Sequence, residues 1–255
     1  MFAAAIAWNT FLEAVREKVL YLLAAFAGFV FLGSRIFAPL ALGEGRRVTI
    51  DLGMMGLSVA GLLVVVFVGH SLVYRELERG TVAFLFSRPV GRGSFVLGKF
   101  LGLAGVLAVL VAAMATILAA VLFASGYPIG PELLASSAIA LLELWILAAL
   151  AILLASLASP ITAGLFVVAA WVIGNAAGAL GDLAALFPSD FARTAAGALL
   201  WVLPRLDLYD AAYGLVHAVG YSTDRWIWTI AYAGVYIGSC LLLARAAFAR
   251  RPLFG

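Results

Sequence analysis

Long apolar stretches alternate with short polar segments along this chain. The apolar stretches run from about Val19 to Pro39, Leu52 to Val73, Phe100 to Ser125, Leu133 to Leu157, Ile161 to Leu180 and Trp226 to Ala247. A helix needs about 20 residues to cross a hydrocarbon core about 30 Å thick, and each stretch is long enough. The pattern therefore predicts an all-α polytopic membrane protein with about six transmembrane helices, all within one domain over residues 1–255.

Two further segments have an amphipathic pattern. In residues 1–18, Trp8, Leu12 and Val15 recur at helical spacing opposite polar side chains, which predicts an interfacial helix along the membrane surface. Residues 182–225 are moderately polar and interrupted by prolines, which predicts short amphipathic helices at the membrane surface between the fifth and sixth spans.

Composition supports the membrane interpretation. Hydrophobic residues make up 65% of the chain, charged residues 11%, and the mean hydropathy is +1.14. Soluble domains carry about 25% charged residues, so a water-soluble fold of this size is excluded. The net charge of +3 could suggest nucleic acid, but the basic residues cluster at helix ends, and we expect no nucleic-acid partner.

The positions of lysine and arginine predict the orientation. With the N-terminus inside, the inner segments hold Arg16, Lys18, Arg75, Arg79, Arg88, Arg92, Lys99, Arg245, Arg250 and Arg251, and the outer ones hold Arg35, Arg46, Arg47, Arg193, Arg205 and Arg225. Basic residues favour the cytoplasmic side. We therefore expect both termini and residues 74–99 in the cytoplasm and residues 182–225 outside, although Arg46 and Arg47 go against this rule.

Residues 74–99 form the most polar segment between two spans. Acidic and basic side chains alternate there and are followed by the apolar run Ala83-Phe-Leu-Phe. Charge alone fits equally well with a solvated loop anchored by basic residues. The apolar run favours a folded element that docks a cytoplasmic partner through arginine contacts.

The same segment carries a family resemblance. The runs Val73-Tyr-Arg-Glu-Leu-Glu-Arg-Gly-Thr, Ser87-Arg-Pro-Val-Gly-Arg and Phe95-Val-Leu-Gly-Lys-Phe-Leu-Gly resemble the permease subunits of type-2 ABC transporters. The branch with the permeases of nitrous-oxide-reductase maturation and gliding motility is the most similar. The resemblance covers the first 105 residues, with Gly91 where a small polar residue is expected, and beyond Gly105 it is limited to hydropathy.

The resemblance implies a coupling helix that sits in a cleft of a separate ATPase subunit. The residues that would form or brace this contact are Arg75, Glu76, Glu78, Arg79, Gly80, Thr81, Arg88, Pro89 and Arg92. The partners implied are that cytoplasmic ATPase, which would bind ATP and Mg²⁺, and a second copy of this chain or a sister permease. A further hypothesis is that residues 182–225 bind an external partner. The resemblance also implies that the protein is located in the cytoplasmic membrane of a prokaryote.

A phosphate-loop pattern occurs in the same region. Gly93-Ser-Phe-Val-Leu-Gly98-Lys99 matches the spacing, but Phe100 stands where Ser or Thr would bind Mg²⁺, and Lys99 opens a membrane span. We therefore expect no nucleotide site and no enzymatic activity in this chain, so an ATP-driven function requires a partner.

Two polar residues inside the spans are candidates for the translocation path. Glu143 lies near the middle of the fourth span, where a carboxylate costs several kcal/mol unless it is protonated or paired. Asn175 lies in the fifth span within Gly174-Asn-Ala-Ala-Gly178. A structural alternative stays open for both: a protonated glutamate bonded to a neighbouring helix, and close helix packing around the two glycines.

No metal site is predicted. His70 and His217 are far apart in sequence, and Cys240 is the only cysteine, so no ligand spacing occurs.

Two functions other than ATP-driven transport remain open. A stand-alone transporter or channel driven by an ion gradient would need several intramembrane charges, and Glu143 alone is clearly available. A membrane scaffold or assembly factor without transport would fit the alanine-rich spans.

Overall fold

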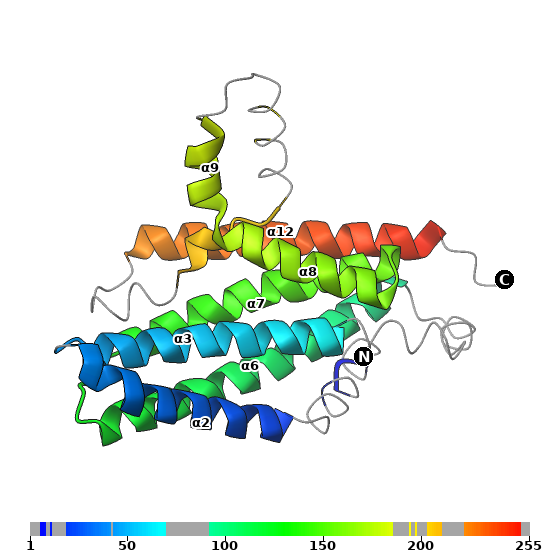
Figure 1. The fold of residues 1–255 in the computed structure, drawn as a ribbon. Helices are drawn as coiled ribbons and strands as arrows, with labels where there is room; N and C mark the ends of the chain where they lie inside the picture. The colour runs from blue at the N-terminus through cyan, green and yellow to red at the C-terminus, as the bar shows by residue number, and fades with distance from the viewer. Residues whose placement is uncertain are drawn as a thin grey trace.

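Long helices run back and forth to form one bundle (Figure 1). The computed structural model describes residues 6–8, 11, 19–41, 43–69, 92–185, 194, 197, 203–210 and 222–250. Its longer elements are α2 (Val19–Phe37), α3 (Gly45–Val64), α6 (Arg92–Ala124), α7 (Glu132–Leu157), α8 (Pro160–Asn175), α9 (Ala177–Ala185) and α12 (Thr223–Arg250). Shorter ones are the 3₁₀ helices η1 (Ala38–Ala41) and η3 (Leu206–Tyr209) and the π-helix η2 (Val65–Gly69).

The described residues confirm the all-α membrane architecture. They contain no strand, and five of their helices are long and apolar enough to cross a membrane. A sixth candidate is the bent pair of α8 and α9. The fold class predicted from the sequence is therefore confirmed, and the five or six candidate spans agree with the expected number of about six.

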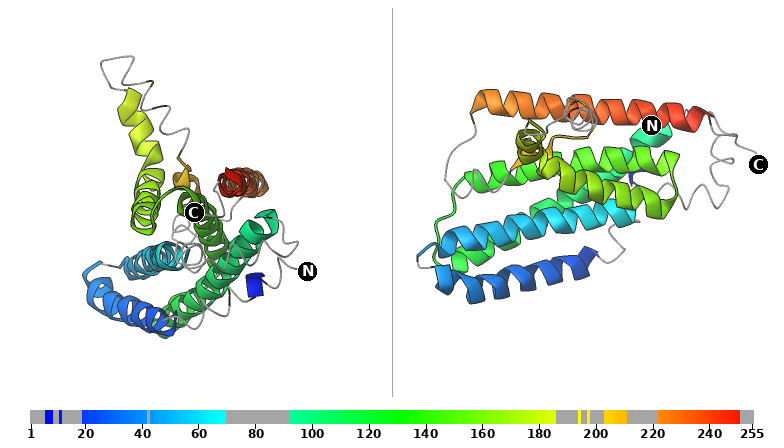
Figure 2. Two further views of the ribbon diagram at one scale, coloured as in Figure 1. Left: turned by 90° about the vertical axis from the view of Figure 1, so that its right-hand side faces the viewer. Right: turned by 45° about the horizontal axis from the view of Figure 1, so that its top comes forward.

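The most buried span is α7, which packs against α12, α6, α8 and η2. Seen along the bundle, it lies among the other long helices (Figure 2). Ala140, Leu144 and Leu147 are fully buried. Because α7 is apolar on every side, it fits a position surrounded by other helices.

Two spans begin earlier than expected. The expected start of the second span was Leu52, yet α3 begins at Gly45, which is buried and where an added β-carbon would push against the Tyr127 hydroxyl. Arg47 pairs with Asp51 one turn later at 3.9 Å, and such pairs support an exposed helix end. Likewise α6 begins at Arg92. Polar residues near these ends extend the helices beyond their apolar stretches.

The fifth span is broken. An unbroken helix was expected over residues 161–180, but α8 ends at Asn175 and α9 continues at an angle of 67°. The contacts that produce this break belong to the candidate site below.

The two amphipathic segments are described only in part. Residues 6–8 are helical, and the Trp8 and Phe11 rings stack with centroids 5.9 Å apart. Residues 12–18 lie outside the described residues, so the interfacial helix stays a prediction. Of residues 182–225, the structure describes the end of α9, residues 194 and 197, residues 203–210 and the start of α12.

Tight packing between α3 and α7 gives a test of the bundle. At Gly61, a β-carbon would overlap the Leu144 side chain, whereas at Gly28 it would meet nothing within 4 Å. We expect Gly61→Val to destabilise the protein by about 1–3 kcal/mol through overpacking. The measurement is the apparent melting temperature of the purified protein in detergent. Gly28→Val is the matched control, and equal melting temperatures for the two variants would contradict this packing.

Candidate functional site

A carboxyl group lies buried between α7 and α8. Glu143 is 3% exposed. By helical rise it lies roughly 17 Å from the start of α7 and roughly 21 Å from its end. Its Oε1 atom accepts hydrogen bonds from Trp171 Nε1 and Asn175 Nδ2, each at 3.1 Å. The two polar residues predicted from sequence are therefore in direct contact.

Asn175 connects this buried carboxyl to the surface of the bundle. The side of α8 that faces away from the other described helices carries Ile161, Leu165, Val168 and Val172, all exposed, and Asn175 is the last exposed residue on that side. An amide group facing lipid would lack hydrogen-bond partners on its lipid side. This side of α8 therefore suits contact with protein or water near Asn175.

The break after α8 is stabilised by close contacts. Asn175 Nδ2 also donates to the Trp171 carbonyl oxygen at 3.0 Å, one turn back. A β-carbon at Gly174 would lie 2.6 Å from the Pro204 carbonyl oxygen and 2.9 Å from Leu206 Cγ. Only glycine therefore allows the segment before η3 to pack against the end of α8.

Sequence reasoning missed Trp171, Tyr209 and Ser136. Trp171 precedes Asn175 by four residues, so helical spacing could have placed both on one side of α8. The Tyr209 hydroxyl donates to the Thr229 carbonyl oxygen at 2.8 Å and ties η3 to α12. Ser136 Oγ is buried in α7 without a hydrogen-bond partner among the described residues, two turns before Glu143.

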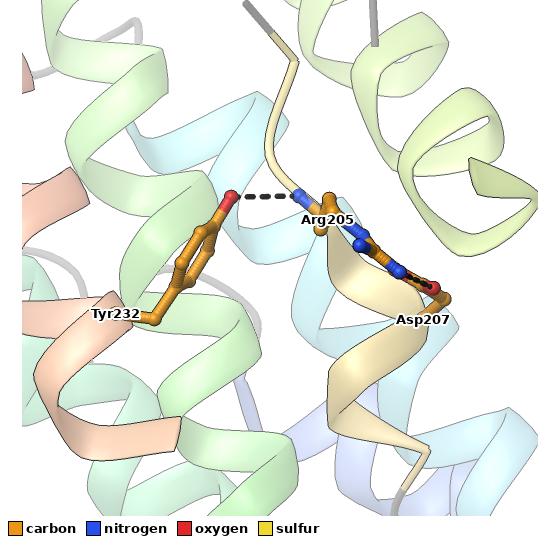
Figure 3. Close-up of polar contacts among 3 residues, drawn as sticks. All are labelled: Arg205, Asp207 and Tyr232. Carbon is orange, nitrogen blue, oxygen red and sulfur yellow. Dashed lines mark hydrogen bonds and ion pairs between the residues drawn. The ribbon is translucent and has the colours of Figure 1, made fainter. Parts of the chain in front are cut away.

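An ion pair lies beside the same break (Figure 3). Arg205 Nη2 donates to Asp207 Oδ2 at 2.9 Å, and the Arg205 backbone N–H donates to the Tyr232 hydroxyl oxygen at 3.0 Å. Hydrogen bonding and charge attraction to Asp207 raise the pKa of Arg205 above its ordinary value. The guanidinium therefore stays charged at every physiological pH.

The predicted ATPase-coupling residues lie almost entirely outside the described residues. Arg75, Glu76, Glu78, Arg79, Gly80, Thr81, Arg88 and Pro89 are in this group. Arg92 is the first residue of α6. Their role stays a prediction.

No group of three His, Cys, Asp or Glu side chains that could hold a metal ion occurs among the described residues. Cys240 is buried in α12, and both histidines lie outside the described residues.

The contacts of Glu143 make it an anchor for the end of α8. In Glu143→Ala, Trp171 Nε1 would lose this acceptor and Asn175 Nδ2 would lose one of its two acceptors. We expect this loss to lower the free energy of unfolding by about 1–3 kcal/mol. In Glu143→Gln, the amide oxygen can still accept both bonds. We expect a clearly lower melting temperature for the alanine variant and recovery with glutamine.

The control for this prediction is Glu44→Ala, because Glu44 is exposed and makes no side-chain cap bond. If Glu143→Gln lowered the melting temperature as much as Glu143→Ala does, the negative charge of Glu143 rather than its hydrogen bonds would stabilise the protein.

A family comparison covers nearly the whole chain. The model described as ABC-2 family transporter protein matches residues 4–251, which include every described helix. No curated protein matches the chain significantly. With its apolar spanning helices, the chain therefore belongs to the ABC-2 family of transporters, as a multi-pass membrane permease subunit.

Proposed function

We propose that this chain is the membrane half of an ATP-driven pump whose hydrolysis takes place in a separate cytoplasmic ATPase subunit. That subunit binds ATP and Mg²⁺ and docks on residues 74–99, where Arg75, Glu76, Glu78 and Arg79 provide its main contacts. Closure of the ATPase on ATP moves this segment and switches the membrane domain between two states. The match to the ABC-2 family over residues 4–251 carries this proposal.

The topology of the bundle supports the position of the coupling segment. The end of η2 and the start of α6 flank residues 70–91, and both lie at the same end of the bundle as the start of α2 and the end of α12 (Figure 1). With both termini in the cytoplasm, the coupling segment faces the cytoplasm as well.

The shape of α6 suits transmission of a movement. Its 33 residues span about 50 Å, which exceeds the bilayer core of about 30 Å. Near its start, Lys99 is 3% exposed and its Nζ lies 5.9 Å from the Phe95 ring centre. The Phe95 ring packs edge-on against Phe248 of α12. A displacement of the coupling segment would therefore reach α6 and α12 together.

A second membrane domain completes the proposed pump, as another copy of this chain or a sister permease. Substrate passes between the two domains, with the exposed Asn175 in the wall of that path and the buried Glu143 holding the Asn175 amide from behind. The exposed side of α8 that ends in Asn175 supports this, because a neighbouring domain or water would provide partners for the amide.

The finer assignments rest on the sequence. The distribution of arginine and lysine supports an orientation with both termini inside. The family resemblance supports a location in the cytoplasmic membrane of a prokaryote. The runs from Val73 to Thr81 and from Ser87 to Arg92 support the branch that includes the permeases of nitrous-oxide-reductase maturation and gliding motility.

The coupling segment can be tested directly by mutagenesis. In the complex with its ATPase subunit, Glu76→Ala and Arg79→Ala should each lower ATP hydrolysis at least several-fold or release the ATPase, because charge-assisted contacts would be lost. The measurements are the ATPase rate of the purified complex and the amount of ATPase retained.

Arg47→Ala serves as the control, because Arg47 forms an exposed ion pair in the first turn of α3, and this end of α3 is opposite to the end from which η2 continues. Unchanged hydrolysis and retention in both coupling variants would rule out this docking site.

A further inference from the structure

A pocket of about 670 Å³ lies where α9 leaves the bundle. Pockets for small ligands typically measure about 300–1,000 Å³. Its described lining consists of Ala177, Gly178, Gly181 and Asp182 of α9, together with Gly197, Arg205 and Tyr232. The α9 wall therefore carries one long side chain, Asp182, and Arg205 and Tyr232 are the other polar side chains of the described lining.

Arg205 lines this pocket and can supply hydrogen-bond donors to it. Figure 3 shows its contacts with Asp207 and Tyr232. Asp207 takes two of its N–H groups, from Nη2 at 2.9 Å and from Nε at 3.4 Å. A guanidinium has five N–H donors, so three remain for a ligand. The side chain is 53% exposed. The Tyr232 hydroxyl accepts from the Arg205 backbone and can still donate its own hydrogen.

Asp182 of α9 supplies a negative charge to the same pocket. A β-carbon at Gly178 would lie 3.4 Å from Asp207 Oδ2, so α9 begins beside the ion pair. Asp182 follows four residues later, about 6 Å along the helix axis, and is exposed. Asp207, which is paired with Arg205, and Asp182 would both repel a simple anion at Arg205. A zwitterion can place its phosphate on the remaining N–H donors of Arg205 and its ammonium on Asp182.

The pocket lies close to the expected level of the lipid head groups. Tyr232 follows Trp226 and Trp228 by six and four residues, which is about 6–9 Å along α12. Trp228 is 75% exposed. Tryptophans near the end of a span mark the membrane interface. A lipid could therefore place its head group in this pocket while its tails stay in the bilayer.

We propose that this pocket binds a phosphate–ammonium zwitterion, with the phosphate at Arg205 and the ammonium at Asp182. The same chemistry occurs in phosphatidylethanolamine lipids and in soluble phosphoethanolamine. The glycines of α9 allow the ligand to approach the helix backbone closely. This site is independent of ATP coupling and of the orientation of the chain in the membrane.

Native mass spectrometry of the full-length protein in mild detergent tests this proposal. The probes are dioleoyl phosphatidylethanolamine and dioleoyl phosphatidylglycerol, which lacks the ammonium group. We expect tighter binding of the ethanolamine lipid, and about tenfold weaker binding of it in Arg205→Gln and in Asp182→Asn. Asp182→Asn should also bind the two lipids about equally.

Three controls complete the experiment. Arg47→Gln, in an exposed ion pair elsewhere, should bind like the unmodified protein. Arg205→Lys and Asp182→Glu, which keep the charges, should recover most of the binding. Equal binding of both lipids by the unmodified protein, or undiminished ethanolamine-lipid binding in both neutral variants, would overturn the proposal.

Soluble phosphoethanolamine separates the two sources of the ligand. If millimolar phosphoethanolamine displaces the lipid, the head group alone is sufficient and a soluble ligand fits. If it does not, while the variants weaken lipid binding as expected, the lipid is the ligand because its tails contribute.

Discussion

Lipid offers no hydrogen-bond partners, so a helix that breaks inside a membrane protein must be stabilised by the protein itself. The break after α8 meets this constraint through Glu143, which accepts bonds from Trp171 and Asn175, and through Gly174, which admits the Pro204 carbonyl. The direction of α9, the position of η3 and the pocket between them all follow from this break. A buried acid in α7 thus shapes a region that lies outside its own helix.

Hydropathy was sufficient to predict the architecture, because each span needs a long apolar stretch. It failed at the ends of spans, where Arg47 and Asp51 belong to α3 although they are polar. It also missed the break after α8, because the stretch from Ile161 to Leu180 is long and apolar enough for a continuous span despite Asn175. That break depends on contacts with η3, which lies about thirty residues further along the chain, and apolar periodicity carries no information about such contacts.

The candidate site was partly predictable for a similar reason. Glu143 and Asn175 could be found because polar groups are rare inside spans, and the structure shows them in contact. Trp171 is a common type of residue in a span, and its role depends on the indole N–H group that donates to Glu143. The sequence did not show that this acid lies nearby. Arg205 served only in the count of basic residues, and the pocket that it lines together with Asp182 depends on the turn of α9. The coupling residues stay predictions from resemblance.

The proposed permease function assigns a role to each of these features. The end of η2 and the start of α6, which flank the proposed coupling segment, lie at one end of the bundle, and α9, which lines the pocket, leaves the bundle away from that end. Glu143 lies near the middle of α7. A long α6 joined to α12 near the coupling segment offers a physical route by which ATP hydrolysis could alter the membrane domain. Dependence on a separate ATPase is therefore the claim on which the proposed mechanism rests.

Mild extraction of the tagged chain from native membranes, followed by mass spectrometry of the proteins that purify with it, tests this claim most directly. We expect a soluble subunit with a complete nucleotide-binding sequence, present in stoichiometric amount. Recovery of the chain alone after gentle extraction at several salt concentrations would contradict the claim and favour a gradient-driven transporter or a scaffold.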